Sequence, residues 1–126
     1  METYKKKIIK LTQNKKTIFV LSVPQKFKNI ITNCLLIIDS GKVVHKVIKT
    51  QLPNYGVFDE KRYFFENIER TNYFKYKKKK IKFLICEDLW AQKSPKLKNE
   101  KKLDLIFSIN ASPYEIGKDS IRKNIS

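Results

Sequence analysis

The chain of 126 residues is long enough for one modest domain or for part of a larger one. Hydrophobic residues make up 41% of it and aromatic residues 12%, which excludes wholesale disorder. The formal net charge of +16 would suit nucleic acid or an anionic membrane surface, but every apolar stretch is too short to span a membrane, and the start of the chain lacks the pattern of a secretory signal.

The first half of the chain predicts three buried strands rich in apolar and β-branched residues. The predicted elements are a frayed lead-in or surface helix over 1–16, a strand over 17–23 stopped by Pro24, a loop over 25–30, and strands over 33–38 and 42–48. Between the last two strands, Asp39-Ser40-Gly41-Lys42 predicts a hairpin turn in which Gly41 takes a positive φ.

The second half predicts a mixed α/β pattern in which three loops of chemical interest each follow a strand. Pro53 and Gly56 place residues 51–60 in a loop that is rich in aromatic residues. The remaining predicted elements are a helical turn within 61–70, a hairpin of strands 72–76 and 81–85 around Lys77–Lys80, a helix starting at Ser94-Pro95, a strand over 103–109 and a helix over 115–125.

Cys86 is the residue that most suggests chemistry, because it stands at the end of the apolar strand 81–85. The thiolate is the attacking form of a cysteine nucleophile, so Cys86 needs a positive charge or a base beside it. Lys49 can supply that charge and stabilise an oxyanion, while Glu60 can accept a proton or orient Lys49. Ser112 offers a hydroxyl and backbone N–H groups to a polar substrate.

Three segments carry a more specific signal, and they occur in a fixed order. They are KTQLPNYGVFDEKRYF over 49–64, FLICEDLW over 83–90 and NASPYE over 110–115. In that order they resemble the lysine loop, the nucleophile segment and the substrate-binding loop of the amidase domain of glutamine-dependent NAD(+) synthetases. That domain belongs to the nitrilase, or carbon–nitrogen hydrolase, superfamily. The likeness runs from about residue 17 to the end of the sequence.

The resemblance implies an α/β fold, a partial nitrilase-type sandwich with the layer order α-β-β-α. It also implies hydrolysis of L-glutamine to release ammonia through a cysteine thioester, without a metal or an organic cofactor. By position, the expected catalytic residues are Cys86 as the nucleophile, Lys49 as the catalytic lysine and Glu60 as a supporting glutamate. The residues expected to hold glutamine are Tyr55, Ser112 and Lys118.

Some parts of the family pattern have no counterpart in the sequence. Nothing matches the strand and turn that carry the general-base glutamate, and Glu2 stands in no comparable context. Nothing matches the ATP-binding synthetase domain either. We therefore expect a basic lead-in over 1–16 and an incomplete amidase domain over 17–126. The expected partners are L-glutamine, a complementary fragment or a synthetase domain, and a second copy in a homo-oligomer; no membrane is expected.

Two alternatives stay open at this point: an inactive gene remnant without independent function, and a basic nucleic-acid-binding protein. The lysines are spread along the whole chain, and only three residues are Arg, the side chain best suited to bases and phosphates. We therefore place a biased base composition of the gene above nucleic-acid binding as the origin of the charge.

The remaining cysteine, histidine and acidic residues predict structural roles. Two cysteines without regular spacing and a single His exclude a disulfide framework or a zinc cluster, and they fit a reduced, cytoplasmic setting. Cys34 lies mid-strand and is predicted to be core, and His45 is predicted to be solvated. Glu87-Asp88 predicts a structural turn rather than a metal pair.

Overall fold

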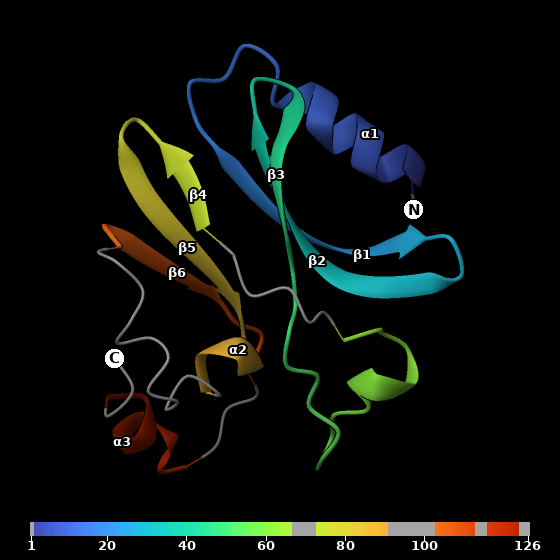
Figure 1. Cartoon of the computed structure of the whole chain (residues 1–126), viewed down its shortest axis with the longest axis vertical. Coiled ribbons are helices and arrows are strands. Elements are labelled where there is room, and N and C mark those ends of the chain that lie inside the picture. Colours follow the sequence, from blue (N-terminus) through green and yellow to red (C-terminus); the bar gives the residue numbers. More distant parts are fainter. Residues whose placement is uncertain (1, 67–72, 91–102, 113–115, 124–126) are drawn as a thin grey trace.

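The computed structural model describes residues 2–66, 73–90, 103–112 and 116–123, which form two three-stranded sheets and several helices (Figure 1). Its elements are α1 (Glu2–Leu11), β1 (Phe19–Phe27), β2 (Ile30–Asp39), β3 (Lys42–Ile48), the 3-10 turn η1 (Glu60–Arg62), β4 (Tyr73–Tyr76), β5 (Lys79–Ile85), α2 (Glu87–Trp90), β6 (Leu105–Ile109) and α3 (Lys118–Lys123). Sheet A has the order β1-β2-β3 and is antiparallel. Sheet B has the order β4-β5-β6, with β4 antiparallel and β6 parallel to β5.

Strand β2 is buried on both faces and lies at the centre of the core. Successive side chains of a strand point to opposite faces of its sheet. Cys34, Leu36 and Ile38 form a cluster on one face, against which Ile9 of α1 packs. On the other face, Leu35 and Ile37 pack with Ile81, Phe83 and Ile85 of β5. Sheet A therefore lies between α1 and sheet B, as Figure 1 shows.

Helix α1 confirms the surface-helix alternative for the start of the chain, and its end is fastened to sheet A. The Thr12 hydroxyl donates to the carbonyl of Ile9 (2.7 Å) and accepts a hydrogen bond from the N–H of Gly41 (3.0 Å). Gly41 has φ +77°, and a Cβ there would meet the Gln13 side chain at 2.4 Å. The β2–β3 turn was predicted with a positive φ at this glycine, and that prediction is confirmed.

The predicted stop at Pro24 is wrong. Strand β1 runs through Pro24, which pairs with Asn33, and continues to Phe27. Within the described residues β1 pairs only with β2, so the proline nitrogen, which has no hydrogen to donate, can face away from the ladder. The loop predicted over 25–30 is in fact the end of β1, a tight turn in which Lys28 has φ +52°, and the start of β2.

In sheet B the hairpin of β4 and β5 is confirmed, and its turn is shorter than predicted. Only Lys77 and Lys78 lie between the strands, with φ of +45° and +64°. The strand predicted over 103–109 is confirmed as β6. Of the helical turn expected within 61–70, the structure has the 3-10 turn that begins at Glu60. The predicted helix start at Ser94-Pro95, residues 67–70 and parts of the segment 115–125 lie outside the described residues.

The predictions for Cys34 and His45 have opposite outcomes. Cys34 is core, as predicted, with 1% of its surface exposed. His45 is not solvated: it is half-buried, and its ring stacks on Phe74 of β4 with centroids 5.5 Å apart. His45 and Val47 lie on the same face of β3, since alternate side chains of a strand share a face. Val47 belongs to the core between the sheets, so this face is turned toward sheet B.

Candidate active site

Cys86 lies in a sharp turn between β5 and α2, with its backbone in the left-handed region at φ +48°. Its N–H donates to the carbonyl of Ile109 at the end of β6, and its carbonyl accepts from the N–H of Leu89, both at 3.0 Å. A left-handed conformation costs a residue with a Cβ roughly 1–2 kcal/mol, so the surrounding hydrogen bonds must maintain it. Such strained turns are typical of positions where a nucleophile projects from the end of a sheet.

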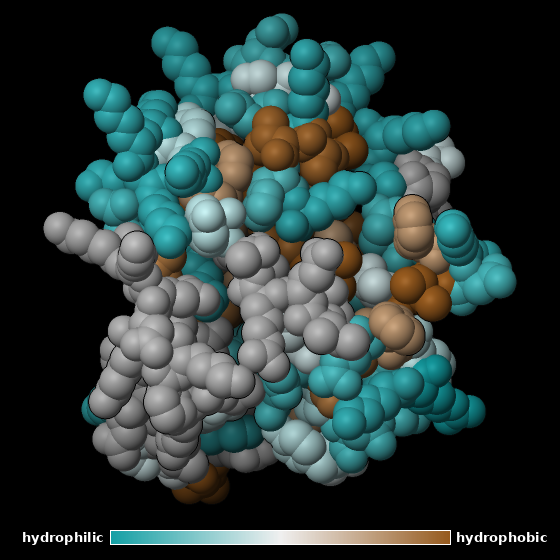
Figure 2. Space-filling view, in the orientation of Figure 1, coloured by the Kyte–Doolittle hydropathy of each residue, from teal (hydrophilic) through white to brown (hydrophobic). Residues whose placement is uncertain are grey.

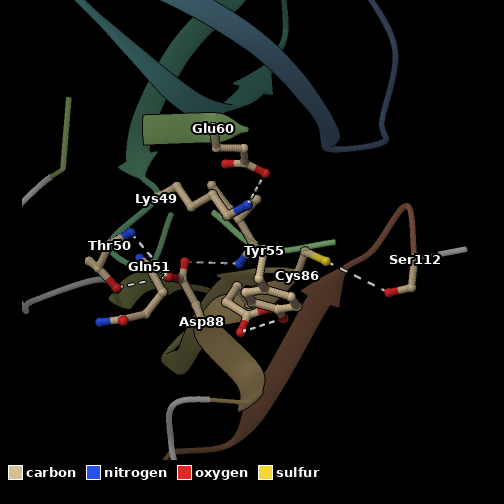
Figure 3. A network of polar contacts seen from close by, with 10 residues as sticks. Lys49, Thr50, Gln51, Tyr55, Glu60, Cys86, Asp88 and Ser112 are labelled. Atoms are coloured by element: carbon tan, nitrogen blue, oxygen red, sulfur yellow. Dashed lines mark hydrogen bonds and ion pairs between the residues drawn. The ribbon is translucent and has the colours of Figure 1, made fainter. Parts of the chain in front are cut away.

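The Cys86 side chain is partly exposed and points toward the segment that follows β6. Its Sγ lies 3.7 Å from Oγ of Ser112 (Figure 3). Cys34, in contrast, is fully buried, and burial raises the pKa of its thiol above the ordinary value. Nearby Lys46 acts in the opposite direction, but burial is the larger effect. Of the two thiols, Cys86 is therefore the one placed to react.

Lys49 follows β3 and forms a buried ion pair with Glu60. Its N–H donates to the carbonyl of Asn33 (2.9 Å), and its ammonium lies 2.5 Å from Oε1 of Glu60 (Figure 3). The Glu60 N–H in turn donates to the carbonyl of Pro53 (3.2 Å), which closes the loop between the two residues. The Oε2 atom of Glu60 is buried, and within the described part of the chain no group bonds to it.

Asp88 connects the lysine loop to the turn that carries Cys86. Its Oδ1 accepts hydrogen bonds from the Thr50 N–H (3.0 Å), the Thr50 hydroxyl (2.8 Å) and the Gln51 N–H (2.8 Å). Its Oδ2 accepts from the N–H of Ile85 (3.2 Å). Thr50 is the neighbour of Lys49, and Ile85 is the neighbour of Cys86, so two segments far apart in sequence meet at one carboxylate (Figure 3).

A second contact between the same segments involves Tyr55 and Glu87. The Tyr55 hydroxyl lies 3.0 and 2.9 Å from the two carboxylate oxygens of Glu87. The Tyr55 ring makes an edge contact with Phe58 in the same loop. Because Glu87 directly follows Cys86, this pair is a second link between the lysine loop and the turn that carries Cys86.

The structure brings most of the sequence-predicted site residues together in three contacts: Lys49 with Glu60, Cys86 with Ser112, and Tyr55 with the neighbour of Cys86. Lys118 opens α3 and is half-buried. The roles assigned to these residues stay predictions. Sequence reasoning missed the connecting role of Asp88 and the contact of Glu87; their position next to the nucleophile was the available signal.

Among the described residues, no three His, Cys, Asp or Glu side chains gather as a metal site would require, and no described helix is long and apolar enough to cross a membrane.

The chain is similar in sequence and in structure to proteins of known type. No protein-family model matches the chain. A glutamine-dependent NAD(+) synthetase from Acinetobacter baylyi is 39% identical over 90 residues, which cover 71% of this chain and 16% of that protein. The structure of glutamine-dependent NAD(+) synthetase from Acinetobacter baumannii matches 97% of this chain with a TM-score of 0.83 and 33% identity, and 23% of that chain is covered.

A carbon–nitrogen hydrolase from Helicobacter pylori shares the fold. It matches 98% of this chain with a TM-score of 0.72 at 18% identity, and 43% of that protein is covered. The chain thus spans less than a quarter of the length of the synthetases it matches and less than half of this hydrolase. The predicted nitrilase-type α/β fold is confirmed, and over most of its length the chain matches a segment of glutamine-dependent NAD(+) synthetases.

Proposed function

We propose that this chain carries the nucleophile part of an amidase site that hydrolyses the side-chain amide of L-glutamine. One observation carries the proposal: Cys86 lies in a strained turn at the end of β5, and Asp88 fastens the loop that holds the Lys49–Glu60 pair to that turn. The names of the synthetase relatives, which are glutamine-dependent, support the choice of substrate. In this proposal residues 17–126 form the amidase segment, and α1 covers sheet A.

The chemistry needs a thiolate, a stabilised oxyanion and a proton carrier. The Cys86 thiol gives its proton to a base, and the sulfur forms a bond to the carboxamide carbon. Lys49 stabilises the negative oxygen of the tetrahedral intermediate through its positive charge. The carbon–nitrogen bond then breaks, and the base returns the proton to the leaving nitrogen, so that ammonia departs and a thioester remains. Water cleaves the thioester, which yields L-glutamate and restores the thiol.

The base in this scheme is a carboxylate for which the sequence has no matching segment. Glu60 is bonded to Lys49 and serves as its support rather than as the base. Loss of a general base costs about 10²–10⁴-fold in rate. The chain by itself is therefore expected to form the covalent adduct with a reactive analogue more readily than to turn over glutamine.

The charged side chains near the site suit the two charged groups of a free amino acid. A free amino acid carries an ammonium group and a carboxylate at one end. Glu87, held by Tyr55, suits the ammonium group, and Lys118 suits the carboxylate. Ser112, next to the sulfur, offers a hydroxyl to the bound amide.

The test uses a glutamine analogue with a diazo-ketone in place of the carboxamide, which alkylates a thiol that attacks it. Mass addition at Cys86 and none at Cys34 is the expected result, since Cys34 is buried and Cys86 is partly exposed. The control is Cys86→Ser, which should take up no label. The absence of labelling, or equal labelling of both cysteines, would overturn the proposal.

The gene-remnant alternative makes a different prediction about folding. A remnant without a stable core should unfold without a cooperative transition in urea, as followed by circular dichroism. The two packed clusters on either side of β2 favour a folded chain with a cooperative transition. For the nucleic-acid alternative, Figure 2 shows hydrophilic residues at the top and at the lower right of the face in view, with hydrophobic residues between them, rather than in one patch.

A further inference from the structure

The carboxylate of Asp88 is among the most deeply buried charged groups in the described chain, with 3% of the residue exposed. A buried carboxylate must be paired or fully hydrogen-bonded to be tolerated. The four hydrogen bonds that the structure gives Asp88 all come from neutral donors, three of them backbone N–H groups. Hydrogen bonds to a charged acceptor are about twice as strong as those between neutral groups, so the carboxylate holds its four donors firmly.

The donors divide into two groups that lie 34 or more residues apart, at 50–51 and at 85. Three come from the segment that directly follows Lys49, and they converge on Oδ1. The fourth comes from the residue that directly precedes Cys86, and it binds Oδ2. One rigid group therefore fixes the backbone next to the lysine relative to the backbone next to the thiol.

We propose that Asp88 is a positioning residue, which holds the ammonium of Lys49 at the distance from the Cys86 sulfur that the thiolate requires. This inference rests on the proposed function in that it takes Cys86 as the nucleophile. Asp88 acts through Lys49 and touches no substrate. A displacement of about 1 Å of a group in an active site can cost about 100-fold in rate, so the loss of this connection should be measurable in the reactivity of the thiol.

Asp88→Asn tests the proposal with minimal change of shape. The side-chain oxygen of Asn can still accept from the lysine-loop donors, but its amide nitrogen is itself a donor and would face the N–H of Ile85. The measurement is the rate at which iodoacetamide, an uncharged reagent, alkylates Cys86 between pH 5 and pH 10, with the modified cysteine identified by mass spectrometry.

The expected result is a pH profile for Asp88→Asn that is displaced to higher pH, with alkylation at pH 7 slowed by roughly 10-fold. Lys49→Gln should show the same displacement, because it removes the positive charge directly. In the double variant Asp88→Asn/Lys49→Gln, the two effects should not add, since Asp88 acts through Lys49.

Asp104→Asn is the matched control. Asp104 also accepts a hydrogen bond from a backbone N–H, that of Lys80 at 2.8 Å, but it lies before β6, at the other end of sheet B from Cys86. Its substitution should leave the alkylation profile unchanged.

If Asp88→Asn fails to give a cooperative urea transition, Thr50→Val provides the test, because it removes one donor and leaves the other three. It should produce a smaller displacement in the same direction.

The proposal is overturned if a folded Asp88→Asn, or a folded Thr50→Val where the first does not fold, has the profile of the unaltered chain. The proposal is also overturned if the displacements caused by Asp88→Asn and Lys49→Gln add fully in the double variant. The proposed function fails separately: if the diazo-ketone analogue leaves Cys86 unlabelled while Asp88→Asn displaces the iodoacetamide profile, Asp88 positions the lysine and the substrate is not glutamine.

Discussion

The ammonium of Lys49 lies 2.5 Å from a carboxylate oxygen of Glu60, and only 2% of the lysine is exposed. The two residues stand at the ends of one loop, and the backbone bond from Glu60 to Pro53 folds that loop back on itself. A lysine this deeply buried needs a counter-charge, because removal of one charged partner leaves the other uncompensated.

We expect Glu60→Ala to destabilise the chain by about 3 kcal/mol, and the double variant Lys49→Met/Glu60→Leu to cost less than this single change. The reason is that the single variant leaves a buried cation, whereas the double variant replaces both charges by apolar side chains. Urea unfolding of the double variant, of Lys49→Met and of Glu60→Leu completes the cycle. A cost for Glu60→Ala within about 0.5 kcal/mol of zero, which is the usual scatter of surface substitutions, would show that the ion pair is not needed for folding.

The left-handed backbone of Cys86 gives a second prediction. At φ +48° an alanine keeps the steric penalty of the Cβ, whereas glycine does not. Cys86→Gly should therefore be more stable toward urea than Cys86→Ala, by about 1 kcal/mol. Cys34 is the matched control, since it lies within β2 and has no positive φ. There the order should reverse, with Cys34→Gly less stable than Cys34→Ala. The same order at both positions would contradict the assignment of strain to the turn.

Much of this fold could be predicted because its buried strands are simple apolar runs. The runs before Asp39 and Cys86 are buried on both faces, so their hydrophobicity does not depend on knowing which face packs where. The β2–β3 turn was also predictable, because Gly41 takes the positive φ that such a turn requires.

The features that could not be predicted depend on neighbours distant in sequence. Pro24 ends a strand only where both edges of the strand are paired, and the edge position of β1 is a property of the whole sheet. His45 is half-buried because Phe74 of β4 stacks on its ring, although the surrounding sequence is rich in lysine. Asp88 looked like any acidic residue in a turn, and its hydrogen bonds to Thr50 and Gln51 depend on how two segments meet.

The turn between β4 and β5 gives a third prediction. Both of its residues, Lys77 and Lys78, have positive φ, which glycine and asparagine adopt more easily than lysine does. Lys78→Gly should therefore stabilise the chain by about 1 kcal/mol in urea unfolding. Lys75→Gly is the control within β4, where glycine should destabilise. If Lys78→Gly proved destabilising, the turn in solution would differ from the one described.

The burial of His45 makes stability depend on pH. Its Nε2 is buried, no group in the described part of the chain bonds to it, and burial lowers the pKa of the imidazole below the ordinary value of 6.5. The unfolded chain therefore binds a proton more readily than the folded chain does. The contribution of His45 to stability is unaffected above pH 6.5 and falls as the pH is lowered through that value toward the folded-state pKa.

His45→Phe removes the titrating group and keeps an aromatic ring against Phe74. Between pH 7.5 and pH 5.5 the unaltered chain should lose more stability in urea than His45→Phe does. The comparison isolates the histidine, because the carboxylates and lysines are the same in both chains. Parallel curves would mean that the imidazole reaches water when it takes up its proton. A steeper loss in the unaltered chain would show instead that the contact between β3 and β4 resists a positive charge between the sheets.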